Sequence, residues 1–338
     1  MVNYLFLKDE SMRYCFFFPY GGIDRYIFKD VIDLNNVRTV FLNKSDISGP
    51  KALLKRIHRS ESVNAYINLP LKHIWDDWTY INNILQDCEC LVFTSTALVY
   101  LDIKLLKSIK NKGHKMVLII YDSLSGNSHH LKAVKNCIHA FSWDVVLSFD
   151  ASDCQKFGFT SIDFAMYSYL KENRSDNCSD IYFIGKNKAG RNIEIKRLYE
   201  VLHNSGVVCD FHIKEIDRLH KKREDVWDAG MHIFYNRNIP YEEVIKDVLS
   251  TNVILEYLHE GQQAQSLRYY EAVCYNKKLL TNNRNISKLP FYNPQYMKLF
   301  SLAEDINVEW IKKREKINYG YNREFSPVRI LKIIESKL

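Results

Sequence analysis

The sequence predicts an α/β chain built around two parallel sheets. Short runs that are apolar on both faces and rich in β-branched and aromatic residues alternate with amphipathic helical stretches. The alternation stops once, in a polar stretch without periodicity at 166–179, and restarts at 180. The length of 338 residues also exceeds a usual domain of roughly 100–200 residues. We therefore expect two doubly wound domains, with ligands at the carboxyl ends of their strands.

In the first half, 1–165, two helical patterns lie among the predicted strands. Leu101, Leu105 and Ile109 recur at helical spacing, and 74–85 is a second amphipathic stretch. The predicted strands are 14–18, 38–42, 65–69, 90–94, 115–121 and 144–149.

The second half repeats the alternation after the linker at 166–179. Its domain is predicted to span 180–315, followed by a tail, 316–338, that ends in a closing helix with Pro327 in its first turn. The predicted strands are 180–184, 207–213, 231–235, 252–257 and 277–281, and the predicted helices are 195–202, 214–228, 241–249 and 266–275.

Composition narrows the class of protein. Hydrophobic residues at 46% and charged residues at 26% are typical of a globular chain and exclude a disordered or collagen-like one. The net charge of +7 favours an anionic partner, whether a phosphorylated small molecule, a membrane surface or nucleic acid. No Cys-x-x-Cys pair is present, so the usual zinc spacing is missing. The first residues are too quickly charged for a signal peptide and no apolar run could span a bilayer, so we expect a cytoplasmic chain that at most lies on a membrane.

The segment 256–283 holds the most informative group of residues. Ser266 is expected to cap a helix that follows a strand, and the free N–H groups of such a helix bind phosphate. Arg268 lies in the first turn, where a guanidinium adds charge-assisted bonds to phosphate, and Glu271 follows within reach of a ribose. A capped surface helix with a solvent-facing Glu explains the same residues equally well.

This segment also resembles the donor site of a known family. It reads EYLHEGQQAQSLRYYEAVCYNKKLLTNN, and the order of its E-G-Q, S-L-R, E-A and K-K-L-L-T-N-N parts resembles GT-B glycosyltransferases, especially those that build bacterial lipopolysaccharide and capsule. The segments 180–191, 239–244 and 252–256 are similar to that group as well. The resemblance covers roughly 180–300, and the first half only in layout.

The resemblance implies a fold and an activity. The fold is two Rossmann-like domains facing a central cleft, with the nucleotide-sugar on the C-terminal domain and the acceptor on the N-terminal one. The activity is transfer of a sugar, of hexosyltransferase type, from a nucleotide-diphosphate donor to a glycan or lipid-linked acceptor in surface polysaccharide synthesis. We expect a UDP-sugar donor and no metal or other cofactor, because a helix dipole and basic residues can stabilise the leaving diphosphate.

The resemblance also implies roles for individual residues. Arg268 and Lys188 would hold the diphosphate, Glu271 the ribose and Glu260 the sugar. Many retaining members carry a Glu eight residues before the ribose-binding Glu, where this chain has Gln263, so retention and inversion both stay open. The full donor-binding set is Gly185, Lys186, Lys188, Arg191, His259, Gln265, Ser266, Leu267, Arg268 and Glu271.

Candidates in the first half follow strand ends. Gly21 and Gly22 come after the first strand, where glycine lets the backbone approach an acceptor, and Asp24 follows closely. An inverting transferase needs a general base, for which Asp24 and Asp122 are the catalytic candidates together with Glu260. For Asp122, a helix cap is the slightly favoured interpretation. The pair at 129–130 is His-His and lacks a third metal ligand at a known spacing.

Two basic stretches, Lys51–Arg59 and Lys104–Lys115, lie on predicted amphipathic helices. They suit docking on anionic lipid at the inner face of a cell membrane, and a solvated helix face explains them at least as well. The alternative function is a non-catalytic two-domain module that binds nucleic acid or a protein through these helices. Recognisable nucleic-acid-binding motifs are missing, so no nucleic acid is expected, and the absence of Gly-x-Gly-x-x-Gly after any strand disfavours an oxidoreductase.

Overall fold

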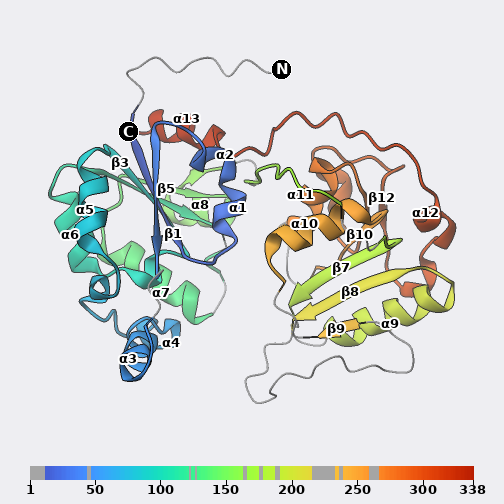
Figure 1. The fold of residues 1–338 in the computed structure, drawn as a ribbon. Coiled ribbons are helices and arrows are strands. Elements are labelled where there is room, and N and C mark those ends of the chain that lie inside the picture. The colour runs from blue at the N-terminus through green and yellow to red at the C-terminus, as the bar shows by residue number, and fades with distance from the viewer. Residues whose placement is uncertain are drawn as a thin grey trace. The chain divides into compact units, whose positions relative to one another are not determined.

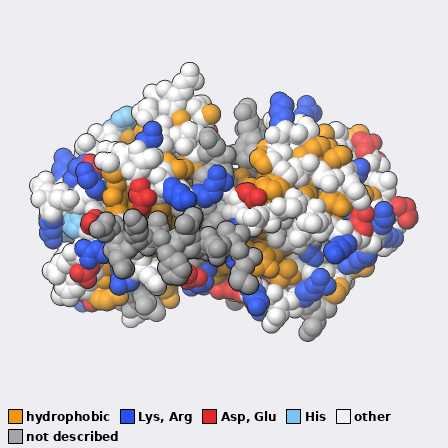
Figure 2. All heavy atoms as spheres, turned by 90° about the horizontal axis from the view of Figure 1, so that it is seen from above, with side chains coloured by type: hydrophobic (Ala, Val, Ile, Leu, Met, Phe, Trp, Pro, Cys, Tyr) orange, Lys and Arg blue, Asp and Glu red, His pale blue; other side chains and the backbone are white. Residues whose placement is uncertain are grey.

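The chain forms two compact units (Figure 1). Residues 1–168 and 325–338 make up the first unit, and 169–324 the second. The change from one to the other falls inside the predicted linker. The computed structural model describes residues 12–43, 47–121, 123–125, 128–162, 166–174, 178–186, 191–214, 233–235, 239–258 and 266–338. On the face drawn in Figure 2, Lys and Arg side chains are interspersed with acidic and uncharged ones.

The first unit is a six-stranded parallel sheet in the order β2-β1-β3-β4-β5-β6. Its strands are β1 (Tyr14–Pro19), β2 (Val37–Leu42), β3 (Cys90–Thr94), β4 (Lys115–Ile120), β5 (Val145–Ser148) and β6 (Thr160–Ser161). Its helices are α1 (Asp24–Ile27), α2 (Lys29–Ile32), α3 (Pro50–His58), α4 (Glu61–Asn64), α5 (Trp78–Gln86), α6 (Ile103–Lys110), α7 (His129–Ala140), α8 (Ala151–Phe157) and α13 (Arg329–Glu335), with 3₁₀ turns at Lys72–Trp75 and Leu98–Tyr100.

Alternate residues of β1 are buried in two different clusters, as expected for a central strand covered on both faces. Cys15 and Phe17 belong to one cluster, and Phe16 and Phe18 to the other. The second cluster also contains Ile334 of α13, so the chain end returns to complete this unit. The predicted tail, 316–338, is therefore divided at 324–325 between the two units.

The second unit is also a six-stranded parallel sheet, in the order β12-β11-β10-β7-β8-β9. The two doubly wound sheets predicted from the sequence are thus confirmed. The strands are β7 (Ile181–Lys186), β8 (Cys209–Lys214), β9 (Ile233–Tyr235), β10 (Val253–Glu256), β11 (Lys278–Thr281) and β12 (Met297–Leu299). The helices are α9 (Arg191–Asn204), α10 (Tyr241–Ser250), α11 (Leu267–Cys274) and α12 (Val308–Lys312), with 3₁₀ turns at Ile286–Lys288 and Ala303–Asp305.

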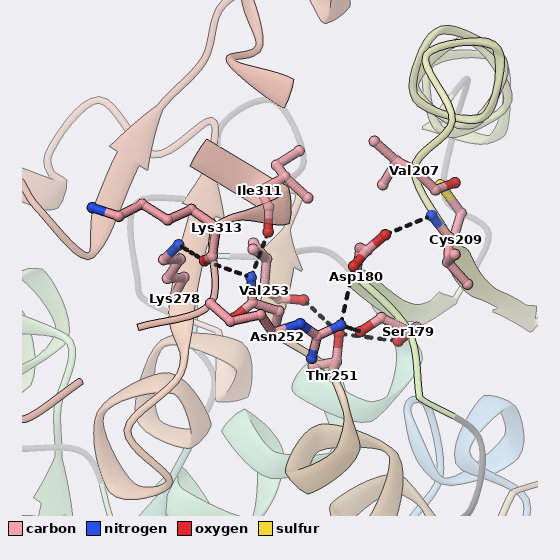
Figure 3. Close-up of polar contacts among 12 residues, drawn as sticks. Ser179, Asp180, Val207, Cys209, Thr251, Asn252, Val253, Lys278, Ile311 and Lys313 are labelled. Atoms are coloured by element: carbon pink, nitrogen blue, oxygen red, sulfur yellow. Dashed lines mark hydrogen bonds and ion pairs between the residues drawn. The ribbon is translucent and has the colours of Figure 1, made fainter. Parts of the chain in front are cut away.

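Polar side chains bind the end of α12 and the residue after it to the amino ends of the strands in the second unit (Figure 3). Asn252 donates from Nδ2 to the carbonyl oxygens of Ile311 and Lys313, and the Lys278 ammonium also donates to the Lys313 carbonyl. Ser179 donates to the Thr251 hydroxyl at 3.0 Å. These buried groups satisfy one another's hydrogen bonds, so this end of the sheet is structural.

One predicted element is wrong and one lies outside the described residues. The run 65–69 forms no strand, because Asn64 holds it in a turn after α4: its Oδ1 accepts from the Leu69 N–H at 3.1 Å, and its Nδ2 donates to the His58 and Ser60 carbonyls. The helix predicted at 214–228 falls on residues 215–228, which are not described. No helix among the described residues is long and apolar enough to cross a bilayer.

Candidate functional site

The strand order of the second sheet places a switch point between β7 and β10. From there β8 and β9 lie on one side and β11 and β12 on the other. In open parallel sheets, ligands bind outside the carboxyl ends of the strands at such a point. The helix α9 begins shortly after β7, and α11 begins eleven residues after β10. The predicted donor residues that are described therefore lie at or after the carboxyl ends of the two strands of the switch point.

Arg191 packs directly against Gly185 at this place. A Cβ on Gly185 would come within 1.8 Å of Arg191 Nη2, so a side chain there would displace the guanidinium from its place. The Arg191 guanidinium also lies 5.5 Å above the Phe183 ring, and Nη1 donates to the Tyr257 carbonyl at 3.4 Å. Burial lowers the pKa of Arg191 from its usual value. A cation at the first residue of a helix opposes the helix dipole, and a bound anion would remove that conflict.

The start of α11 is fixed to the end of β10 by Glu256. Its carboxylate accepts from the Ser266 N–H at 3.1 Å, the Ser266 hydroxyl at 2.7 Å and the Thr281 hydroxyl at 2.6 Å. Ser266 also caps the helix as predicted, since its Oγ accepts from the Arg268 N–H at 3.1 Å. Burial raises the pKa of Glu256, while the hydroxyl donors act in the opposite direction.

Arg268 and Glu271 lie on one face of α11 and bind each other. Arg268 Nη2 donates to Glu271 Oε1 at 2.7 Å, and the Tyr241 hydroxyl donates to the same oxygen at 2.7 Å. Both side chains are buried, and burial raises the pKa of Glu271 although Arg268 lowers it. Glu271 therefore does not face solvent. The second oxygen of its carboxylate, Oε2, has no hydrogen-bond partner among the described residues.

The remaining predicted donor residues divide into two groups. Lys186 is exposed at the last position of β7, and Leu267 is half-buried at the first position of α11. The others lie outside the described residues; they are Lys188, His259, Gln265 and the catalytic candidates Asp122 and Glu260.

The first sheet has its own switch point, between β1 and β3, and Asp24 lies beside it. Asp24 is only 3% exposed. The Thr96 hydroxyl, which follows β3, donates to the two Asp24 carboxylate oxygens at 3.4 Å each. A Cβ on Gly22 would lie 2.8 Å from Asp24 Oδ2, so glycine there admits the carboxylate. Gly21 adopts φ +78°, which favours glycine in the turn after β1.

The electrostatic environment of Asp24 suits a proton acceptor. Burial raises the pKa of Asp24, and the nearby Tyr121 and Thr96 hydroxyls partly offset this. Burial and the nearby Asp24 charge raise the pKa of Tyr121 well above its usual value. A carboxyl whose pKa is shifted toward neutral pH is a better general base than an ordinary surface Asp.

Two groups of side chains include possible metal ligands. His129 and His130 contact α4 instead: His129 Nδ1 lies 3.3 Å from Ser62 Oγ, and His130 Nδ1 lies 3.5 Å from Glu61 Oε1. Asp210, His212 and Asp247 place one ligand atom each within 4.8 Å of one another in the second unit. His212 Nε2 and Asp210 Oδ1 are 2.8 Å apart, so these two groups already bind each other, and no metal is assigned there.

Three residues that shape these sites were not predicted from the sequence. Tyr121 and Thr96 adjoin Asp24, and Glu256 orders the start of α11. Thr96 and Glu256 follow or end a strand at a switch point, and Tyr121 follows β4, the next strand beside β3. The strand order, which local patterns do not contain, would have been needed to single them out.

Comparisons with known proteins give loose structural similarities. No family model matches the chain, and no curated protein matches its sequence. A UDP-GlcNAc 2-epimerase from Methanocaldococcus jannaschii is 11% identical with a TM-score of 0.49, covering 96% of this chain and 99% of its own. The DNA-modifying enzyme β-glucosyltransferase is 9% identical with a TM-score of 0.46, covering 96% and 93%. The glycotransferase of kitacinnamycin is 9% identical with a TM-score of 0.45, covering 97% and 98%. These overlaps are too loose to assign an activity to the chain.

Proposed function

We propose that this protein is a glycosyltransferase that moves a sugar from a nucleotide-diphosphate donor to an acceptor hydroxyl. One observation carries the proposal. The described candidate residues of each unit lie at the carboxyl ends of the strands that flank its switch point, where doubly wound sheets bind ligands. The second unit offers cations and a helix start there, and the first unit offers a shielded carboxyl group.

The donor is assigned to the second unit. The N–H groups at the start of α11, together with Arg191 and Lys186, match a diphosphate in charge and hydrogen-bonding capacity. In this proposal they stabilise the negative charge that develops as the diphosphate leaves. Arg268 and Lys188 join them, and Glu271 Oε2 accepts a ribose hydroxyl. Because Arg268 and Glu271 bind each other in the described structure, donor binding then opens their ion pair.

The general base is assigned to Asp24 of the first unit. Asp24 takes the proton of the acceptor hydroxyl as that oxygen attacks the anomeric carbon of the donor sugar. The bond from the anomeric carbon to the diphosphate breaks, and the diphosphate leaves with the electron pair. A single base is what an inverting transfer requires. Glu260 is assigned to the sugar, and Asp122 to a supporting or capping role.

The finer assignments rest on the sequence resemblance of 180–300 to the GT-B families described above. They are a UDP-linked hexose as donor, a glycan or lipid-linked acceptor in bacterial surface polysaccharide synthesis, no metal requirement, and a place at the inner face of the cell membrane. The competing hypothesis of a nucleic-acid-binding module has no recognisable nucleic-acid-binding motif in the sequence to support it.

Donor binding is the direct test. We expect a UDP-sugar to raise the melting temperature of the purified protein more than GDP-, CMP- or dTDP-sugars do. Substitution Arg191→Ala should weaken donor binding by roughly tenfold or more in calorimetry, because a charge-assisted contact to phosphate is lost. The matched control is Arg197→Ala on the same helix, where the exposed Arg197 binds Glu304. If no nucleotide-sugar stabilises the protein, the proposal is wrong.

A further inference from the structure

The two basic helices of the first unit differ in whether their apolar side is covered. On α6, Leu106 is 0% exposed and Ile109 is 2% exposed, whereas Lys104 and Lys107 face solvent. This is the usual arrangement of an amphipathic helix on a soluble domain. The structure therefore accounts for the basic residues of α6 as a solvated face.

The arrangement on α3 is reversed. Leu53 and Leu54 are each 59% exposed and Ile57 is 49% exposed, and no residue of this helix is buried. At helical spacing these three side chains form one apolar stripe, which we call the α3 stripe. Single exposed leucines are common on proteins, but a contiguous apolar stripe on one helix marks an interaction surface.

Contacts at the C-terminal end of α3 attach the helix to the rest of the unit. Arg59, directly after the helix, is buried, forms an ion pair with Asp76, donates to Asn43 Oδ1 at 2.9 Å and lies 5.2 Å above the Tyr100 ring. His58 accepts at Nδ1 from the Trp75 indole at 2.7 Å. Because α3 contacts the rest of the unit through His58 and Arg59, its apolar side chains remain exposed to solvent.

Charged groups border the stripe on both sides. Lys51 and Arg56 are exposed, and on a helical wheel they flank the three apolar residues. Two more exposed apolar side chains, Leu71 and Ile74, lie in the segment whose Pro70 carbonyl and Trp75 indole bind His58. The surface thus combines an apolar centre with a positive border.

We propose that the α3 stripe docks on an anionic lipid bilayer, with Leu53, Leu54 and Ile57 inserted at the level of the headgroups. Apolar residues flanked by Lys and Arg are the pattern of helices that lie in the membrane interface. A second copy of this chain fits less well, because a symmetric dimer through the stripe would bring the two positive borders together.

The position of α3 links this surface to the proposed acceptor side. The helix follows the carboxyl end of β2, and Figure 1 shows α3 and α4 beyond the end of the sheet to which the β1 arrow points. Asp24 follows β1 at that same end of the sheet. A bilayer at α3 therefore lies on the side of the sheet where a lipid-linked acceptor would meet Asp24. This link rests on the proposed function, but membrane binding itself does not.

Vesicle flotation of the full-length protein tests the proposal. Wild type should float with phosphatidylcholine vesicles that contain phosphatidylglycerol, and this binding should weaken as salt is added. The triple variant Leu53→Ser/Leu54→Ser/Ile57→Ser and the charge reversal Lys51→Glu/Arg56→Glu should each reduce the bound fraction by roughly tenfold or more. The matched control, Lys104→Glu/Lys107→Glu on α6, should float as wild type does.

Every changed side chain is exposed, so we expect all variants to keep the wild-type melting temperature and nucleotide-sugar binding. These two readouts separate a failure of docking from a failure of the proposed transferase. Equal flotation of wild type and the triple variant overturns the proposal. So does a wild-type dimer, seen by analytical ultracentrifugation, that the triple variant converts to a monomer while wild type leaves the vesicles unbound.

Discussion

Asp24 carries its carboxyl group where the surroundings disfavour its charge. Burial raises its pKa, and the Tyr121 and Thr96 hydroxyls recover only part of the lost hydration. Gly22 is the residue that admits the carboxylate, since any side chain at that position would meet it. A carboxylate kept at a cost to stability in a shielded position is typical of a functional group.

The substitution Asp24→Asn should therefore separate stability from activity. Because the folded-state pKa of Asp24 is raised, the folded protein favours the protonated form, and stability is lost as pH rises from about 4 through that pKa. The neutral amide removes this loss. We expect a larger free energy of unfolding at pH 7 in urea titrations, no difference from wild type below about pH 4, and turnover reduced by roughly 10²–10⁴-fold.

Tyr121→Phe checks the direction of the electrostatic argument. The lost hydroxyl no longer lowers the pKa of Asp24, so the acidic limb of kcat/KM against pH should move to higher pH. A shift to lower pH, or full activity in Asp24→Asn, would remove Asp24 from the role of base.

At the scale of elements, several hydrogen bonds hold the start of α11 in place. Glu256 at the end of β10 accepts three hydrogen bonds, two of them from Ser266, and Ser266 in turn caps the helix. The helix N-terminus is therefore held at a fixed place beside the end of β10. A preorganised helix start binds a diphosphate without first having to be ordered.

Ser266→Ala removes both the cap and the bond from the Ser266 hydroxyl to Glu256. We expect a loss of about 1–2 kcal/mol of stability, as for other N-cap substitutions, together with weaker nucleotide-sugar binding in calorimetry. Ser128→Ala is the matched control, since Ser128 caps α7 of the first unit by accepting from the Leu131 N–H at 3.2 Å. It should lower stability by a similar amount and leave donor affinity unchanged. Equal effects of both variants on donor affinity would contradict a donor site at α11.

At the scale of the whole molecule, the first unit is made of two segments that are not consecutive in the chain. The last 14 residues, 325–338, belong to the first unit although the second unit precedes them. The helix α13 places Ile330 and Ile334 in the same buried cluster as Phe16, and the Tyr14 hydroxyl donates to Glu335 Oε1 at 3.0 Å. The end of the chain is thus part of the core around β1.

This arrangement predicts that a substitution in the core of one unit affects mainly the stability and binding of that unit. Ile334→Ala should lower the stability of the first unit by about 2–5 kcal/mol and leave nucleotide-sugar affinity unchanged. Ile311 is equally buried in the second unit. Ile311→Ala should instead weaken donor binding, or reduce the rise in melting temperature that the donor produces in calorimetry. If Ile334→Ala weakens donor binding as strongly as Ile311→Ala, the division into units is wrong.

The sequence by itself determined the class of fold and the beginning of α11. Runs that are apolar on both faces and stretches with helical spacing are local patterns, so two doubly wound sheets and the Ser266 cap were predictable residue by residue. The strand predicted at 65–69 does not form, because the conformation of this segment depends on the side chain of Asn64 and not on its own apolar pattern.

The tertiary structure alone decided which candidate side chains are buried and what they contact. Thr96 reaches Asp24 from 72 residues away, and Glu335 meets Tyr14 across 321 residues. Leu53 points to solvent while Leu106 is buried, although both helices have amphipathic patterns rich in basic residues. Sequence periodicity shows that a helix has an apolar side, but which side is covered depends on the packing of distant segments against it.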